Sequence, residues 1–161
     1  MGRPVPYSRE HATAVLHGHD TFYAYSEVAW RPHQNEHQGI TLIADTPIQG
    51  LPELRYITVL RPERLDEPTF LLLLNGAYLQ RIDVNGEHQF RRYTHLQRVT
   101  PDRPNFDEET IDIDATFPRV PHGETIEEKI LERCYRAAAK EFRIDLSGAI
   151  WSAPHLEGVI A

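Results

Sequence analysis

The sequence predicts an α+β fold, with a mainly antiparallel sheet of about five to seven strands and one long C-terminal amphipathic helix packed on one face. Two observations carry this prediction. Strand-like runs at 69–74, 77–84 and 87–99 follow one another with an Asn-Gly pair in each gap, and Asn-Gly between strands is the strongest short-range hairpin signal. The segment 126–142 instead repeats its apolar residues at helical spacing, so one face of that helix must pack on the sheet.

The first third of the chain predicts one short helix followed by strands. Ser8 is placed to cap a helix over 8–16, which ends before Gly18. The aromatic-rich segment 21–30 predicts a strand that Pro32 ends. Beyond it we expect strands at 40–44 and 54–60, with a polar loop at 32–39 and a charged loop at 62–68.

The central part of the chain predicts hairpins. Residues 71–74 are leucines without alternation, which favours a central strand covered on both faces. Asn85 and Gly86 suit a type I′ turn because both of its central positions need positive φ, so we place the turn of the central hairpin there. Asn75 and Gly76 predict a second hairpin turn or a bulge.

The last third predicts one strand and one helix. Segment 100–104 breaks the sheet, and 110–117 alternates apolar with polar residues as a half-exposed strand does. Thr125 and Glu128 have capping-box spacing at the start of the helix over 126–142. The predicted apolar stripe of this helix consists of Ile126, Ile130, Leu131, Cys134, Ala138 and Phe142.

Length and composition predict a single globular domain over residues 1–161. The hydrophobic share of 40% and the charged share of 25% are those of a globular protein. Cys134 is the only cysteine, so an intramolecular disulfide is excluded and a reducing compartment fits. The sequence contains neither the apolar core of a signal peptide nor a stretch long enough to span a bilayer. We therefore expect a cytoplasmic protein without a membrane partner.

Charge is unevenly distributed along the chain. The net charge of −7 argues against a general nucleic-acid coat protein. Segment 79–103 holds five arginines against three acids, whereas 105–128 holds eight acids against Arg119 alone. The two segments can neutralise each other in the fold, or they can serve as separate functional surfaces.

Four of the nine histidines fall in two short groups, His17 with His19 and His33 with His37. Imidazole groups at such spacing can hold Zn²⁺ or another first-row metal. The strand expected between the groups would span about 33 Å and hold them apart. We therefore predict no resident cofactor, and a divalent metal at these histidines is the alternative.

The strand expected at 89–99 carries the best candidate site, because Arg91, Tyr93 and His95 would project from one face. A cation, an aromatic ring and a group that exchanges protons near neutral pH are what a small ribonuclease or a phosphate-binding sheet uses. Arg81 and His88, on the preceding strand, extend this set. The alternative is a solvated sheet face with cross-strand ion pairs, such as Arg81 or Arg91 with Asp83 or Glu87.

Other catalytic signatures are absent. Cys134 lies on the helix stripe, where a thiol is an inert core residue. No nucleophile elbow, P-loop or dinucleotide fingerprint occurs. The acidic stretch at 107–114 lacks the spacing of an EF-hand loop.

Residues 81–86 read Arg-Ile-Asp-Val-Asn-Gly, followed by His88 and by Thr-His-Leu at 94–96. This pattern resembles a loosely defined group of small uncharacterised bacterial and phage proteins, which carry an Arg-Leu-Asp-x-Asn-Gly strand and turn, a histidine and a Thr-His-Leu-His strand. Gln97 stands where the group has its second histidine. The resemblance implies a mobile-element or defence-associated setting and a histidine-bearing hairpin, and it assigns no activity.

Two functions follow as hypotheses. The first is a non-enzymatic interaction or regulatory module, accessory or antitoxin-like, whose aromatic-rich strand and acidic segment bind a protein partner or a second copy. The second is a small nuclease or phosphoryl-handling enzyme that uses Arg91, Tyr93 and His95 and binds nucleic acid through the basic hairpin. The enzyme hypothesis requires these side chains to line an exposed concavity.

Overall fold

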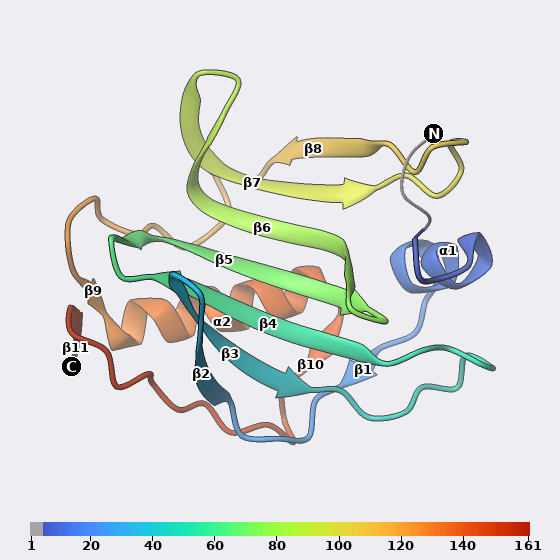
Figure 1. The fold of residues 1–161 in the computed structure, drawn as a ribbon, viewed down its shortest axis with the longest axis horizontal. Helices are drawn as coiled ribbons and strands as arrows, with labels where there is room; N and C mark the ends of the chain where they lie inside the picture. The colour runs from blue at the N-terminus through green and yellow to red at the C-terminus, as the bar shows by residue number, and fades with distance from the viewer. Residues whose placement is uncertain (1–4) are drawn as a thin grey trace.

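The computed structural model describes residues 5–161, so residues 1–4 of the predicted domain lie outside the described residues. This part of the chain forms an α+β fold with a seven-stranded antiparallel sheet and two helices (Figure 1). The elements are, in order, α1 (Arg9–His17), β1 (Phe22–Tyr23), β2 (Ala29–His33), β3 (Glu36–Leu42), β4 (Leu54–Arg61), β5 (Arg64–Leu74), β6 (Ala77–His88), β7 (Arg91–Val99), β8 (Glu108–Asp112), β9 (Ile126–Glu127), α2 (Glu128–Glu141), β10 (Ile144–Asp145) and β11 (Val159–Ile160).

The large sheet is a meander in which each strand from β2 to β8 pairs with the next one along the chain. Two of its hairpins close with two-residue turns whose residues both have positive φ. These are Asn75 and Gly76, at 51° and 83°, and Gln89 and Phe90, at 50° and 66°. Positive φ at both positions is the requirement of the type I′ turn. The hairpin turn predicted at Asn75 and Gly76 is therefore confirmed.

The turn predicted at Asn85 and Gly86 is wrong. β6 runs through this pair, and the pairing with β7 shifts register between Asp83 and Gly86 as a bulge. The Asn85 side-chain amide donates hydrogen bonds to the backbone oxygens of Asp66, at 2.9 Å, and Val120, at 3.0 Å. These contacts with distant segments hold Asn85 inside the sheet, so the local preference for a turn does not decide the outcome.

Several predicted boundaries in the first half of the sheet are also wrong. The strand predicted at 21–30 is divided into β1 and β2, because β1 pairs in parallel with β10 outside the large sheet. The predicted loop at 32–39 is the β2–β3 hairpin, and the predicted loop at 62–68 contains the start of β5. Pro32 is tolerated in β2 because this strand lies at the edge of the sheet.

Helix α2 is shorter than predicted. Its 14 residues begin at Glu128, because Ile126 and Glu127 form β9 and pair with β11. The predicted capping box is therefore not formed, and the N-cap residue, Glu127, makes no side-chain cap bond. The apolar stripe is nevertheless buried, and its buried members are Ile126, Leu131, Cys134, Ala138 and Phe142.

Helix α1 forms as predicted. The Ser8 hydroxyl accepts a hydrogen bond from the His11 backbone N–H at 3.0 Å, and Gly18 caps the other end. The Arg143 guanidinium, in the turn after α2, donates hydrogen bonds to the backbone oxygens of Val15 and Gly18. This contact joins the two helices, which are far apart in sequence.

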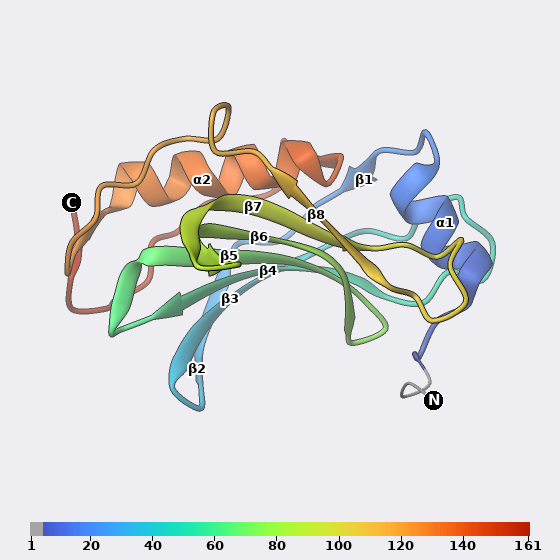
Figure 2. The same cartoon turned by 90° about the horizontal axis from the view of Figure 1, so that it is seen from above.

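The hydrophobic core lies between α2 and one face of the sheet (Figure 2). The Tyr56 ring of β4 stacks on the Tyr135 ring of α2 with centroids 5.1 Å apart, and the Phe142 ring meets Tyr56 edge-on. Each fully buried Leu or Phe side chain contributes about 1.5–3 kcal/mol through lost contact with water. The largest buried side chains are Tyr56, Tyr135, Phe22, Phe70, Phe142, Leu60, Leu65, Leu72, Leu74, Leu79, Ile82 and Leu131.

The opposite face of the sheet, called the open face below, carries no helix of the described residues. β5 is the central strand, as predicted, but only one of its faces is covered. Leu72 and Leu74 are buried under α2, whereas Leu71 and Leu73 are half-buried on the open face. The prediction of a strand covered on both faces is wrong, because an uninterrupted leucine run does not distinguish the two cases.

The strand register arranges the open face in two rows, each crossing β3 to β8. The first row consists of Ile40, Ile57, Leu71, Arg81, Gln97 and Thr110. The second row consists of Gln38, Val59, Thr69, Asp83, His95 and Asp112. The open face is therefore mostly apolar over β3–β5 and polar or charged over β6–β8.

We expect the buried hydroxyl of Tyr56 to stabilise the contact between the sheet and α2. It donates a hydrogen bond of 2.6 Å to the backbone oxygen of Tyr135. The Tyr56→Phe variant lacks this hydroxyl, so its free energy of unfolding should be lower by about 1–2 kcal/mol, as measured by urea denaturation. Tyr23→Phe is the matched control, since the Tyr23 side chain is exposed; equal midpoints for the two variants would contradict the prediction.

Candidate functional site

The β6–β7 hairpin brings together the five residues predicted to form the candidate site. The register sets His95 opposite Asp83, Gln97 opposite Arg81, and Arg91 opposite His88. The rings of His88, Tyr93 and His95 are mutual neighbours, with centroids 4.9–6.4 Å apart. Arg81 joins this group through Asp83, because its Nε lies 3.0 Å from Asp83 Oδ2.

His95 lies at the centre of the cluster and is only 2% exposed. Its Nδ1 is 3.1 Å from the backbone oxygen of Tyr93, and its Nε2 is 3.3 Å from Asp83 Oδ2. Both ring nitrogens therefore face oxygen atoms of the chain. Through these two contacts His95 joins the backbone of β7 to the Asp83 carboxylate on β6.

Asp83 connects the cluster to the neighbouring strand. Besides His95 and Arg81, its carboxylate accepts a hydrogen bond from the Thr69 hydroxyl at 3.0 Å. Burial raises the pKa of Asp83, but the hydrogen bonds from His95 and Thr69 and the charge of Arg81 outweigh this, so the net pKa is lowered. Arg81 and Asp83 form an ion pair, but within β6 and not across two strands as predicted. The role of Thr69 is not predicted, because the sequence does not give the strand order.

The bulge at Asn85 and Gly86 shapes this cluster. A Cβ on Gly86 would lie 2.8 Å from the Asp83 Cβ and 3.2 Å from the His95 Cε1. Contacts this short leave no room for a side chain, so glycine allows the His95 ring to approach the β6 backbone. The Asn-Gly pair therefore forms a bulge that shapes the cluster around His95, and it does not form the hairpin turn.

The outer part of the cluster is charged and more exposed. The Arg91 guanidinium lies 4.0 Å from the Tyr93 ring centroid and 2.5 Å from Asp112 Oδ2. A second pair joins Arg98 to Glu109 across β7 and β8. The basic hairpin and the acidic segment therefore neutralise each other in part, which is one of the two outcomes left open by the charge pattern.

The four histidines considered as metal ligands do not come together. His17 ends α1 and His19 follows it, whereas His33 and His37 lie in the β2–β3 hairpin. Figures 1 and 2 show α1 and this hairpin at opposite ends of the sheet. Within residues 5–161, no three His, Cys, Asp or Glu side chains are grouped so that they could hold a metal ion.

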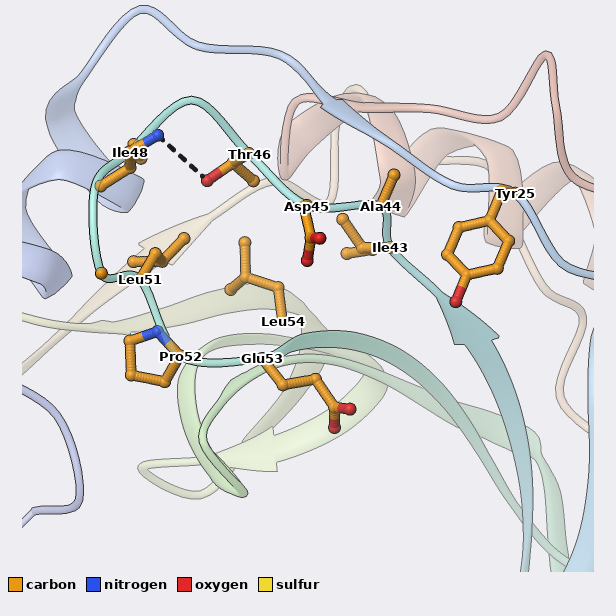
Figure 3. A pocket seen from close by; sticks show the side chains of 11 residues that line it. Tyr25, Ile43, Ala44, Asp45, Thr46, Ile48, Leu51, Pro52, Glu53 and Leu54 are labelled. Atoms are coloured by element: carbon orange, nitrogen blue, oxygen red, sulfur yellow. Dashed lines mark hydrogen bonds between the residues drawn. The ribbon is translucent and has the colours of Figure 1, made fainter.

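A second candidate site, called the Tyr25 cleft below, lies between β1, the end of β3 and the loop that leads to β4. It is a cavity of about 410 Å³, lined by Tyr25 and by residues between 43 and 54 (Figure 3). Ile43, Leu51 and Leu54 supply apolar surface, and Asp45 and Glu53 supply carboxylates. Glu53 Oε1 lies 2.5 Å from Arg55 Nε, and Asp45 makes no ion pair with the described residues.

One exposed aromatic side chain, that of Tyr25, lines this cleft. Along β1 and its continuation, Phe22 and Ala24 are buried, whereas Tyr23 is 57% and Tyr25 is 58% exposed. Sequence reasoning identified the aromatic-rich segment but not the cleft. Pro47, Gly50 and Pro52 mark a loop in the sequence, but nothing in the sequence indicates that Tyr25 lies beside it.

Comparison of the chain with protein-family models, curated proteins and solved structures finds no match. Among residues 5–161, no helix is long and apolar enough to cross a membrane. The geometry of the hairpin cluster and of the Tyr25 cleft therefore carries the functional argument.

We expect protonation of Asp83 to lower the stability of the folded protein in acid. Since its pKa is lowered by folding, the ionised carboxylate contributes stability above its unfolded-state pKa, and this contribution is lost as the pH falls through the folded-state pKa. The free energy of unfolding of the wild type should therefore fall as the pH drops from about 5 through the lowered folded-state pKa, and it should fall less steeply in Asp83→Asn. Urea denaturation at several pH values measures this.

The control for this experiment is Asp102→Asn, because Asp102 is exposed in a loop and makes no ion pair with the described residues. This variant should keep the wild-type dependence on pH. An unchanged slope in Asp83→Asn would show that the hairpin carboxylate does not contribute to acid sensitivity.

We also expect Cys134 to be unreactive in the folded protein. Cys134 lies on the buried face of α2, where its side chain is fully buried in the core, and burial raises the pKa of the thiol to about 12. A thiol reagent such as 5,5′-dithiobis(2-nitrobenzoic acid) at about pH 8 should modify no thiol in native buffer and one thiol in urea. Rapid modification in native buffer would show that the core around α2 opens readily.

Proposed function

We propose that this protein is a non-enzymatic interaction module, accessory or antitoxin-like, that binds a protein partner through the Tyr25 cleft. The observation that carries the proposal is a cavity of about 410 Å³ whose lining includes Tyr25, a tyrosine that is 58% exposed. Tyrosine is enriched among the residues that dominate binding energy at interfaces, because it buries a large ring and retains a hydroxyl for a hydrogen bond.

The lining of the cleft indicates the chemistry of the partner. Apolar side chains from Ile43, Leu51 and Leu54 form its floor, so an apolar side chain of the partner fits there. Asp45 at the border is exposed and has no cationic partner among the described residues. Together with the net charge of −7, this favours a segment that carries lysine or arginine beside its apolar residues.

The arrangement of the hairpin cluster gives less support to acid–base catalysis. A general base needs a nitrogen within hydrogen-bond reach of the substrate, and both nitrogens of the buried His95 face acceptors within the chain. The interaction module therefore agrees better with the geometry than an enzyme centred on His95 does.

A small nuclease or phosphoryl-handling enzyme is the second candidate, and one observation favours it. Arg91 is exposed, and the partly exposed rings of Tyr93 and His88 lie beside it. His88 would then exchange the proton, and Arg91 would bind the phosphate. Hydrolysis of RNA or single-stranded DNA by the purified wild type, lost in His88→Ala, would establish this activity and overturn the module.

The cleft can be tested with defined peptides. We suggest three fluorescein-labelled peptides with the same alternating leucines and with lysine, glutamine or glutamate between them, titrated by fluorescence anisotropy. The lysine peptide should bind most tightly, because its charge complements Asp45. Asp45→Lys should weaken its binding about tenfold or more, which corresponds to about 1.4 kcal/mol, and Tyr25→Ser should weaken it as well.

Glu63→Lys is the matched control, because it makes the same change of charge at the exposed turn between β4 and β5, at the other end of the sheet. This variant should bind the lysine peptide as the wild type does. Equal binding of the lysine and glutamate peptides, or no effect of Asp45→Lys, would contradict the role of the cleft.

A further inference from the structure

The tip of the β6–β7 hairpin carries the most exposed apolar side chain of the described residues. Phe90 is 101% exposed, so its ring makes no contact that shields it from water. Four of the five other phenylalanines are instead buried, namely Phe22, Phe70, Phe117 and Phe142. A phenyl ring left in water contributes nothing to the stability of the fold.

The backbone at this tip is also unfavourable for its residues. Gln89 and Phe90 have φ of 50° and 66°, in the left-handed region that favours Gly and Asn. The same chain makes the same type of turn with Asn75 and Gly76, the residues that suit it. The backbone of the β6–β7 turn is therefore strained, and the phenylalanine at this turn makes no contact that stabilises the folded chain.

The hairpin continues beyond the Asn-Gly pair at 85–86, where the local sequence favours a turn. Past the bulge at Asn85 and Gly86, the strands continue through the Glu87–Arg92 and His88–Arg91 pairs. Figure 1 shows this extension standing out from the rest of the sheet. Two ion pairs connect this extension to other strands: Arg91 pairs with Asp112 at 2.5 Å, and Arg92 pairs with Glu67 at 3.5 Å. Strand pairing and ion pairs thus fix the hairpin, and Phe90 lies exposed at its tip.

Residues held in sparsely populated backbone conformations cluster at functional sites, and at Phe90 this strain coincides with a fully exposed apolar ring. We propose that the tip of the β6–β7 hairpin is a docking element whose Phe90 ring inserts into an apolar socket on another protein. A protein socket fits better than a membrane, because a single ring is a poor membrane anchor. The neighbouring Arg91 and Arg92 are paired with Asp112 and Glu67, on a chain of net charge −7, and so offer little attraction to an anionic lipid surface.

This docking element is separate from the Tyr25 cleft. Figures 1 and 2 place the hairpin tip and the loop between β3 and β4 at opposite ends of the sheet. A variant at one end therefore reports on that end alone, and the docking element stands even if the cleft binds nothing.

The first arm of the test measures stability. Phe90→Gly removes the ring and relieves the positive φ, so its urea midpoint should equal or exceed that of the wild type. Gln89→Asn eases the turn while keeping the ring, and its midpoint should also be no lower. A lower midpoint for Phe90→Gly would mean that the ring supports the fold, and this would overturn the proposal.

The second arm measures docking. The photoreactive amino acid p-benzoylphenylalanine is introduced in place of Phe90, or in place of Gln34 at the tip of the β2–β3 hairpin as a control, and each chain is irradiated in cells of the source organism. One protein should cross-link from position 90 and not from position 34. In a lysate, added wild type and Gln89→Asn should suppress this cross-link, and Phe90→Gly should need about tenfold more protein to do so.

The remaining outcomes overturn the proposal. They are no cross-link from position 90, the same cross-links from both positions, equal competition by Phe90→Gly, a cross-link only to a second copy of this chain, and a cross-link only to lipid. Asp45→Lys should compete as the wild type does, which distinguishes a failure at the hairpin tip from a failure at the Tyr25 cleft.

Discussion

The contact of α2 with the sheet is the constraint on which the rest of the structure depends. The stacked rings of Tyr56 and Tyr135, with the Tyr56 hydroxyl on a helix carbonyl, hold α2 across the central strands. Because side chains alternate along a strand, covering one face assigns every residue of β3 to β8 either to the core or to the open face. The meander then aligns these residues in rows across the sheet, and the polar cluster on β6–β8 follows from that alignment.

The open face shows how a polar network can be buried without lying in the core. His95 is shielded by Gly86, Asp83 and the neighbouring rings, not by α2. Its two nitrogens and the Asp83 carboxylate satisfy one another and the Thr69 hydroxyl. A buried polar network whose hydrogen bonds are all made rigidifies the surface around it. The side chains that remain available to a ligand are accordingly the less constrained ones around this network.

The Gln89–Phe90 turn departs from local preferences, and its exposed phenylalanine makes no contact within the described residues that would compensate. Natural sequences are locally consistent in most positions, and departures concentrate at functional sites. The Asn-Gly pair at 85–86 departs from its turn preference, but tertiary hydrogen bonds and the close approach of His95 account for it. The Gln-Phe turn has no such compensation, and this difference separates a structural departure from a functional one.

Local sequence patterns were sufficient to predict the α+β class, α1 with its Ser8 cap, the Asn75–Gly76 turn and the buried stripe of α2. Helix capping, turn chemistry and periodicity each act over a few residues, so a short stretch of sequence contains them. They also placed Arg91, Tyr93 and His95 on one strand. Only the tertiary structure decided that Asn85 stays inside β6, that His95 is enclosed by Asp83 and Gly86, and that Tyr25 lies beside the loop between β3 and β4. Each of these outcomes depends on contacts between segments far apart in sequence, which no short window of residues contains.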